Sequence, residues 1–190
     1  MSLEEYKARN GRSKKMLLWF AMISMFMTFA GLTSAYVVSA SRPDWVNTFK
    51  LPEAFLISTV VIIISSITFH MAKVATKKGN RSAATAYLMA TLALGLAFVY
   101  CQFYGFQKII ESGFFFTGPE SSVTTSFVYI VTVVHMAHLF AGLVVLLVVI
   151  YNHFKQKYTP SQTLGIELGA MFWHFLDVLW VYLFLFLYFY

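Results

Sequence analysis

The sequence predicts an all-α integral membrane protein, a bundle of five transmembrane helices in one domain. Of its 190 residues, 59% are hydrophobic and only 12% are charged, whereas an ordinary soluble domain is about 25% charged. Five apolar stretches each reach the roughly 20 residues that a helix needs to cross the hydrocarbon core of a bilayer. We expect a basic N-terminal segment over 1–15 and a membrane domain over 16–190, with helices at 16–40, 54–72, 83–107, 123–151 and 164–190.

The connecting residues support the boundaries of these helices in turn. The first stretch, about 25 residues long, exceeds the core of a cleavable signal peptide and is interpreted as a retained anchor. Pro43 and Pro52 separate it from the second stretch, and Gly79-Asn80 is a turn signal between the second and third. Pro119 precedes the fourth stretch and Pro160 the fifth. Since no stretch contains proline, Lys or Arg, we expect five straight helices.

The distribution of basic residues predicts the orientation of the chain. Eleven of the 14 Lys and Arg residues lie in the N-terminal segment and in the second and fourth connectors, and three lie in the first and third connectors. Basic residues accumulate on the cytoplasmic side, so the N-terminus is expected in the cytoplasm and the C-terminus in the periplasm. The net charge of +6 is therefore interpreted as a topology signal, and no nucleic-acid partner is expected.

Five ionisable side chains lie within the fourth and fifth stretches. His135 and His138 belong to the fourth, and Glu167, His174 and Asp177 to the fifth. A charge inside a membrane-spanning helix costs about 2.5–3.5 kcal/mol on insertion scales, so each of these groups requires a partner. If the two helices pack antiparallel, the two histidines of the fourth helix would meet His174 and Asp177 near the middle of the bilayer. Glu167 would lie nearer the cytoplasmic end.

Three interpretations of these five residues compete. They could form a structural polar network, which lipid tolerates when every member is satisfied. They could bind a metal ion or haem, with three imidazoles and a carboxylate as ligands, although ferritin-like sites need more carboxylates. They could also form a proton relay. We favour the structural network, and we place Gln102 and His70 outside it as other polar residues within the membrane.

The fifth stretch closely resembles the signature of cytochrome c oxidase subunit III. In that family a Glu precedes a Trp-His-Phe-x-Asp-x-x-Trp segment, as Glu167 precedes Trp173 to Trp180 in this sequence. The fourth stretch is similar to the family's His-x-x-His-x-x-x-Gly pattern. Further similarities extend over nearly the whole chain beyond the basic segment, at Gln102, Tyr129, Ser65-Ser66, His70, Phe29-Ala30-Gly31 and Ala35-Tyr36.

Two positions depart from the family pattern. Members commonly have a glutamate after the serine of the first helix, where this chain has Ser24-Met25, and a glutamate shortly after the third-helix glutamine, where it has Gly105. The roles of those carboxylates are therefore not transferred to this chain. Its five spans resemble the short bacterial form of the family, in which the cleft formed by two further helices is reduced or is completed by another subunit.

The resemblance implies a subunit of a proton-pumping haem-copper terminal oxidase of aerobic respiration, in the bacterial inner membrane. It implies a non-catalytic subunit that stabilises subunit I, supports proton uptake and binds phospholipid, with haem and copper in subunits I and II. It also implies no metal ligand in this chain, in agreement with a structural role for the five ionisable residues. The alternatives are an autonomous haem- or metal-binding electron carrier and an accessory subunit of a nitric oxide reductase.

Overall fold

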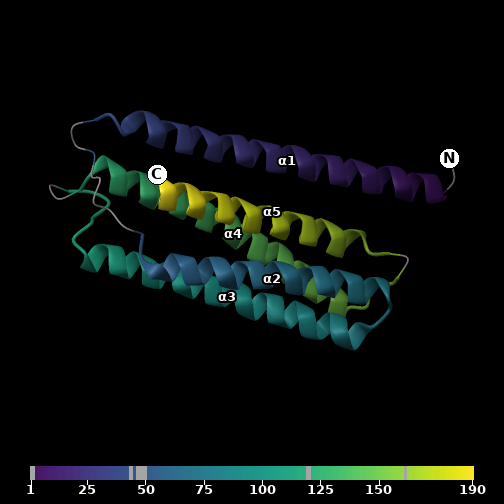
Figure 1. The fold of residues 1–190 in the computed structure, drawn as a ribbon. Coiled ribbons are helices and arrows are strands. Elements are labelled where there is room, and N and C mark those ends of the chain that lie inside the picture. Colours follow the sequence, from purple (N-terminus) through teal and green to yellow (C-terminus); the bar gives the residue numbers. More distant parts are fainter. Residues whose placement is uncertain (1–2, 43–44, 46–50, 119–120, 161) are drawn as a thin grey trace.

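The computed structural model describes residues 3–42, 45, 51–118, 121–160 and 162–190 and forms an elongated bundle of long helices (Figure 1). Five helices within these ranges are long and apolar enough to cross a membrane, which confirms the predicted fold class. They are α1 (Leu3–Ser39), α2 (Glu53–Lys77), α3 (Arg81–Glu111), α4 (Val123–Phe154) and α5 (Leu164–Phe189). Of the prolines used to divide the sequence, Pro43 and Pro119 lie outside the described residues.

The helices extend beyond the apolar stretches that predicted them. α1 begins at Leu3 rather than at residue 16, so most of the basic segment is helical and continuous with the first span. Hydropathy marks where a helix leaves lipid, whereas a helix ends only where its backbone is capped. The start of α3 is capped by the Asn80 side chain, which accepts from the backbone N–H of Ala83 at 3.2 Å. Ser122 and Thr125 form a reciprocal capping box at the start of α4.

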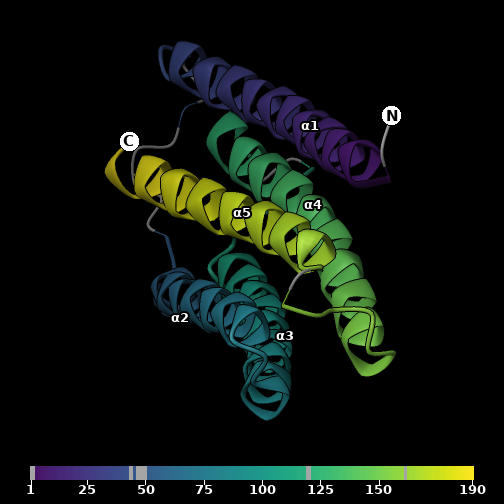
Figure 2. The ribbon, with the colours of Figure 1, turned by 90° about the vertical axis from the view of Figure 1, so that its right-hand side faces the viewer.

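α5 is the most enclosed helix and lies between two helix pairs (Figure 2). It packs against α1 and α4 on one side and against α2 on the other, and α2 and α3 share the most extensive contact of the bundle. α4 and α5 run antiparallel (Figure 1), as the sequence predicted. Within the described residues, α1 makes no contact with α2 or α3. A face of α5 is therefore left open between α1 and α2.

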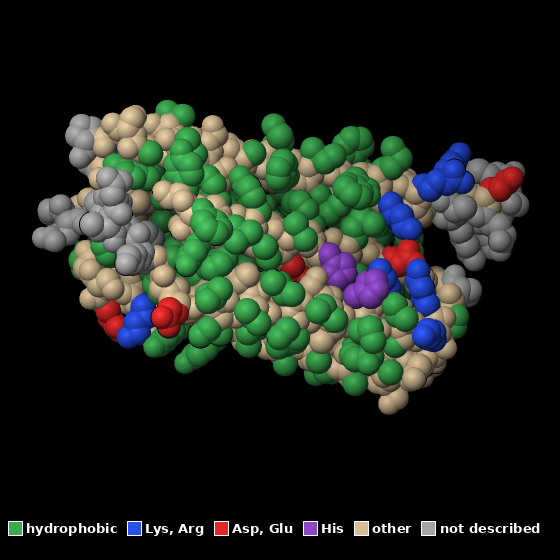
Figure 3. Space-filling view, viewed as in Figure 1, with side chains coloured by type: hydrophobic (Ala, Val, Ile, Leu, Met, Phe, Trp, Pro, Cys, Tyr) green, Lys and Arg blue, Asp and Glu red, His purple; other side chains and the backbone are tan. Residues whose placement is uncertain are grey.

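Glycines allow the buried helices to approach closely. A Cβ added at Gly105 of α3 would lie 2.7 Å from the ring of Phe55 in α2, and one at Gly142 of α4 would lie 2.6 Å from Leu176 in α5. Small residues serve this purpose in membrane bundles, because association depends on close packing rather than on the hydrophobic effect. On the outside, apolar side chains cover most of the face seen in Figure 3, and charged side chains gather towards its two ends.

We predict that Gly105→Ala destabilises the bundle, because the fully buried Phe55 ring must move to admit the methyl group. Overpacking of this kind typically costs about 1–3 kcal/mol. The matched control is Gly31→Ala in α1, where an added Cβ meets nothing within 4 Å. Both changes raise helix propensity equally. Thermal unfolding of the detergent-solubilised chain should therefore separate the two variants, and equal stability would contradict the packing argument.

Candidate functional site

The polar side chains of α5 bond mainly to hydroxyl groups of α2. Three α5 residues each form one hydrogen bond to this neighbour. The pairs are Trp173 Nε1 with Ser65 Oγ at 3.2 Å, His174 Nδ1 with Ser66 Oγ at 2.6 Å, and Trp180 Nε1 with Thr59 Oγ1 at 3.0 Å. Both indole N–H groups are thus satisfied in the interior, which is the usual requirement for a buried tryptophan.

α2 also bonds to α3 on its opposite side. Gln102, fully buried in α3, donates from Nε2 to Ser58 Oγ at 3.0 Å. Thr91 of α3 bonds to Thr68 of α2 through their hydroxyl groups at 2.8 Å, and its carbonyl accepts from Ser65 Oγ at 3.4 Å. α2 therefore supplies hydroxyl groups to both neighbouring helices. This role was not predicted from the sequence, although the Ser65-Ser66 pair was a visible signal.

The structure does not bring the five predicted network residues together. His135 is 1% exposed, and neither ring nitrogen has a hydrogen-bond partner among the described residues. Its imidazole lies among the rings of Phe29, Phe98 and Trp180, with centroid distances of 6.3, 6.3 and 5.0 Å. His138 donates from Nδ1 to the carbonyl of Val134 in its own helix, at 2.8 Å.

The expected meeting of His135 and His138 with His174 and Asp177 is therefore corrected. α4 packs on the side of α5 where Gly142 meets Leu176 and Trp173. His174 projects instead towards α2, where Ser66 is its partner. His135 of α4 meets α5 at the Trp180 ring, whereas His174 of α5 faces α2, so the imidazoles of the two helices do not meet. The structural role of the five residues remains a prediction.

Asp177 is buried one turn beyond His174. It is 3% exposed, and neither carboxylate oxygen has a hydrogen-bond partner among the described residues. The Ser66 hydroxyl of α2 bonds to His174 instead. Of these two α5 residues, only His174 is therefore bonded to α2 within the part of the chain that the structure describes.

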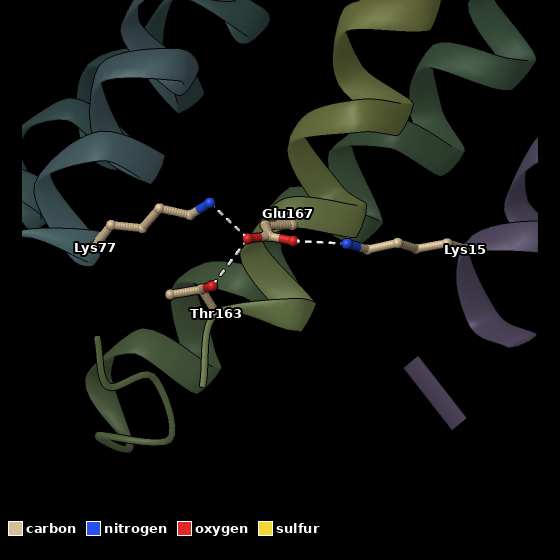
Figure 4. Close-up of polar contacts among 4 residues, drawn as sticks. All are labelled: Lys15, Lys77, Thr163 and Glu167. Atoms are coloured by element: carbon tan, nitrogen blue, oxygen red, sulfur yellow. Dashed lines mark hydrogen bonds and ion pairs between the residues drawn. The ribbon is translucent and has the colours of Figure 1, made fainter. Parts of the chain in front are cut away.

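Glu167 is the charged contact that joins three helices (Figure 4). Its carboxylate accepts from Lys15 of α1 at 3.0 Å, from Lys77 of α2 at 2.7 Å, and from the hydroxyl of Thr163 at 3.0 Å. Glu167 lies in the first turn of α5, where the helix dipole favours a negative charge. Its partners are lysines at the end of the bundle and not histidines of the membrane interior.

His70 lies on the open face of α5 and α2. Its ring centroid is 6.2 Å from that of His174. His174 also lines a groove of about 380 Å³, together with Lys73, Lys77, Glu167 and Met171. Figure 3 shows histidine side chains beside charged groups on this face of the molecule.

The residues considered as metal ligands do not gather at one place among the described residues. In the part of the chain that the structure describes, no three His, Cys, Asp or Glu side chains lie close enough to hold a metal ion. His135 is enclosed by aromatic rings, whereas His174 lies against α2. The three imidazoles and one carboxylate are thus distributed over separate helix contacts.

Comparison with known proteins decides the family. The family model described as cytochrome c oxidase subunit III matches residues 10–190. This chain belongs to that family. It is 32% identical to cytochrome c oxidase subunit 3 of Corynebacterium diphtheriae, over 86% of this chain and 81% of the relative. It is 29% identical to cytochrome bo(3) ubiquinol oxidase subunit 3 of Pseudomonas aeruginosa, over 87% and 79%, and 30% identical to that of Buchnera aphidicola, over 90% of each.

The subunit III fold in this chain is apolar at the two positions that depart from the family pattern. Gly105 lies against the ring of Phe55. Met25 packs against a cluster that contains Met22, Phe172 and Leu176. Close packing thus occupies both places where other members commonly carry a glutamate.

We predict a favourable coupling between Glu167 and Lys77 in a double-mutant cycle of Glu167→Gln and Lys77→Met. Both side chains are partly exposed, at 21% and 50%, and pairs of this kind contribute about 0.2–1 kcal/mol. The cycle is measured by thermal unfolding at low and high salt, because salt screens the attraction. Removing the exposed Lys108–Glu111 pair of α3 is the control and should leave stability unchanged. Strictly additive effects at Glu167 and Lys77 would contradict the link between α5 and α2.

Proposed function

We propose that this subunit III stabilises the catalytic subunit of a proton-pumping haem-copper oxidase, supports its sustained proton uptake and binds phospholipid. The haem and copper belong to partner subunits in this proposal, and the chain has no catalytic residue of its own. The family supplies the setting, a complex with other oxidase subunits. The supporting observation is that Trp173, His174 and Trp180 of α5 each bond to a hydroxyl group of α2.

A scaffold and a redox carrier place different demands on buried histidines. A carrier needs imidazoles that face one another across an open space large enough for a prosthetic group. Here aromatic rings fill the surroundings of His135, and Ser66 takes one nitrogen of His174. Buried polar contacts of this kind fix the rotation and register of helices. This supports a rigid bundle that presents a fixed outer surface to the catalytic subunit.

We predict that His174→Leu weakens assembly of the oxidase. The change removes the partner of the Ser66 hydroxyl, and an unsatisfied buried polar group costs about 1–3 kcal/mol. Less catalytic subunit should then co-purify with the variant in mild detergent. Val178→Leu is the control, because Val178 is 68% exposed on the same helix. A His174→Leu complex that assembled normally but lost oxygen reduction at once would contradict the structural role.

Co-purification also tests the class of complex. If the proposed function is correct, a haem-copper oxidase that reduces oxygen should co-purify with the chain. Mass spectrometry identifies it. A nitric oxide reductase as the only catalytic partner would support the accessory-subunit alternative. A Soret band or stoichiometric metal in the purified chain alone would support the electron carrier.

We predict that the N-terminus lies in the cytoplasm and the C-terminus in the periplasm, because basic residues concentrate at one end of the five spans. Alkaline phosphatase fused after Tyr190 should be active, whereas green fluorescent protein at the same point should be dark. Fusions placed after Lys78, in the connector between α2 and α3, should give the opposite pattern. Fluorescence from the C-terminal fusion would overturn this orientation.

A further inference from the structure

A groove between α2 and α5 lies beside the lysines at the end of α2. Its lining of Lys73, Lys77, Glu167, Met171 and His174 encloses about 380 Å³. It opens on the outer face of the bundle, because α1 and α2 do not touch within the described residues. Figure 2 shows α5 lying between these two helices, with α1 and α2 on either side of it.

Positive charge exceeds negative charge in and beside this groove. Glu167 is shared by Lys15 and Lys77, so one carboxylate faces two ammonium groups. Lys73 has no ion-pair partner among the described residues and lines the groove together with His174. Three lysines and one glutamate leave an excess of two positive charges. A ligand that completes this groove is therefore an anion.

The depth of these groups matches the headgroup boundary of a bilayer. Lys77 ends α2, and His70 lies seven residues earlier, which is about 10 Å along the helix axis. His70 is exposed although it lies within the second membrane span. Further from Lys77 along the two helices, exposed apolar side chains include Ile67 of α2 and Val178 of α5, which are 58% and 68% exposed. Basic, imidazole and apolar side chains thus follow one another along the two helices. This order matches the phosphate group and the acyl chain of a phospholipid.

We propose that the α2–α5 groove binds the phosphate group of an anionic phospholipid. Lys73 and Lys77 provide the positive charge, the exposed His70 provides a hydrogen bond, and one acyl chain lies against Val178 and Ile67. Basic pockets between transmembrane helices on the cytoplasmic side bind acidic lipid headgroups in the same way. This inference rests on the proposed membrane orientation and names the site of the proposed lipid binding.

Native mass spectrometry of the purified full chain, and of the oxidase complex that carries it, tests the site. The probe is phosphatidylglycerol, with phosphatidylcholine and inorganic phosphate as comparison ligands. Lys73→Gln should weaken phosphatidylglycerol binding about fivefold, the usual effect of one basic residue near the headgroups. Lys73→Arg should retain binding. Lys155→Gln is the matched control, because Lys155 follows α4 at the same end of the bundle and packs over Tyr151, away from the groove.

Several outcomes would overturn the inference. Equal binding of phosphatidylglycerol by the wild-type chain and Lys73→Gln would show that the groove is not the binding site. Equal affinity for phosphatidylcholine would remove the requirement for an anion, and equal occupancy by inorganic phosphate would indicate a free-anion site. A helix of a partner subunit seated in the groove of the assembled oxidase would also exclude the lipid. Binding is measured on the chain itself, so its failure is distinguishable from a failure to co-purify with an oxidase.

Discussion

A polar side chain inside a bundle that spans lipid depends on protein for a hydrogen-bond partner, because hydrocarbon offers none. α2 meets most of this requirement. Its hydroxyl groups bond to α5 on one side and to α3 on the other, as Thr59 and Ser58 illustrate on adjacent residues. Serine and threonine suit this task because a short hydroxyl side chain permits close helix contact and can bond either way. The rotation of α2 thus determines how its two neighbours are placed.

Ion pairing acts at a different depth from these hydroxyl contacts. Glu167 sits at the end of the bundle, where lysine side chains can reach it while their ammonium groups remain near water. This contact joins α1 to α2 through α5, although α1 and α2 do not touch each other in the described part of the chain. Among the described residues, the ion pairs therefore lie towards the ends of the bundle, whereas the contacts of the membrane interior are hydrogen bonds and close packing.

Hydropathy predicted the five spans and the antiparallel α4–α5 pair, because both depend on composition and connector length alone. The partners of the polar residues could not be predicted in this way. Whether His174 meets His135 or Ser66 depends on the rotation of each helix about its axis, and a uniformly apolar span carries little information about rotation. The start of α1 was not predicted for a related reason. The basic segment lacks proline, so the helix extends through it on the N-terminal side of the apolar residues.

The length of α1 has a mechanical consequence. A helix of 37 residues measures about 55 Å, whereas the hydrocarbon core is about 30 Å thick. Residues 3–15 of α1 precede its apolar stretch and add about 20 Å of rigid helix, which holds Arg9 and Arg12 in fixed positions near the headgroups. A protein surface close to this part of α1 therefore meets these guanidinium groups in a fixed direction. The length of the helix sets their distance from the lipid surface.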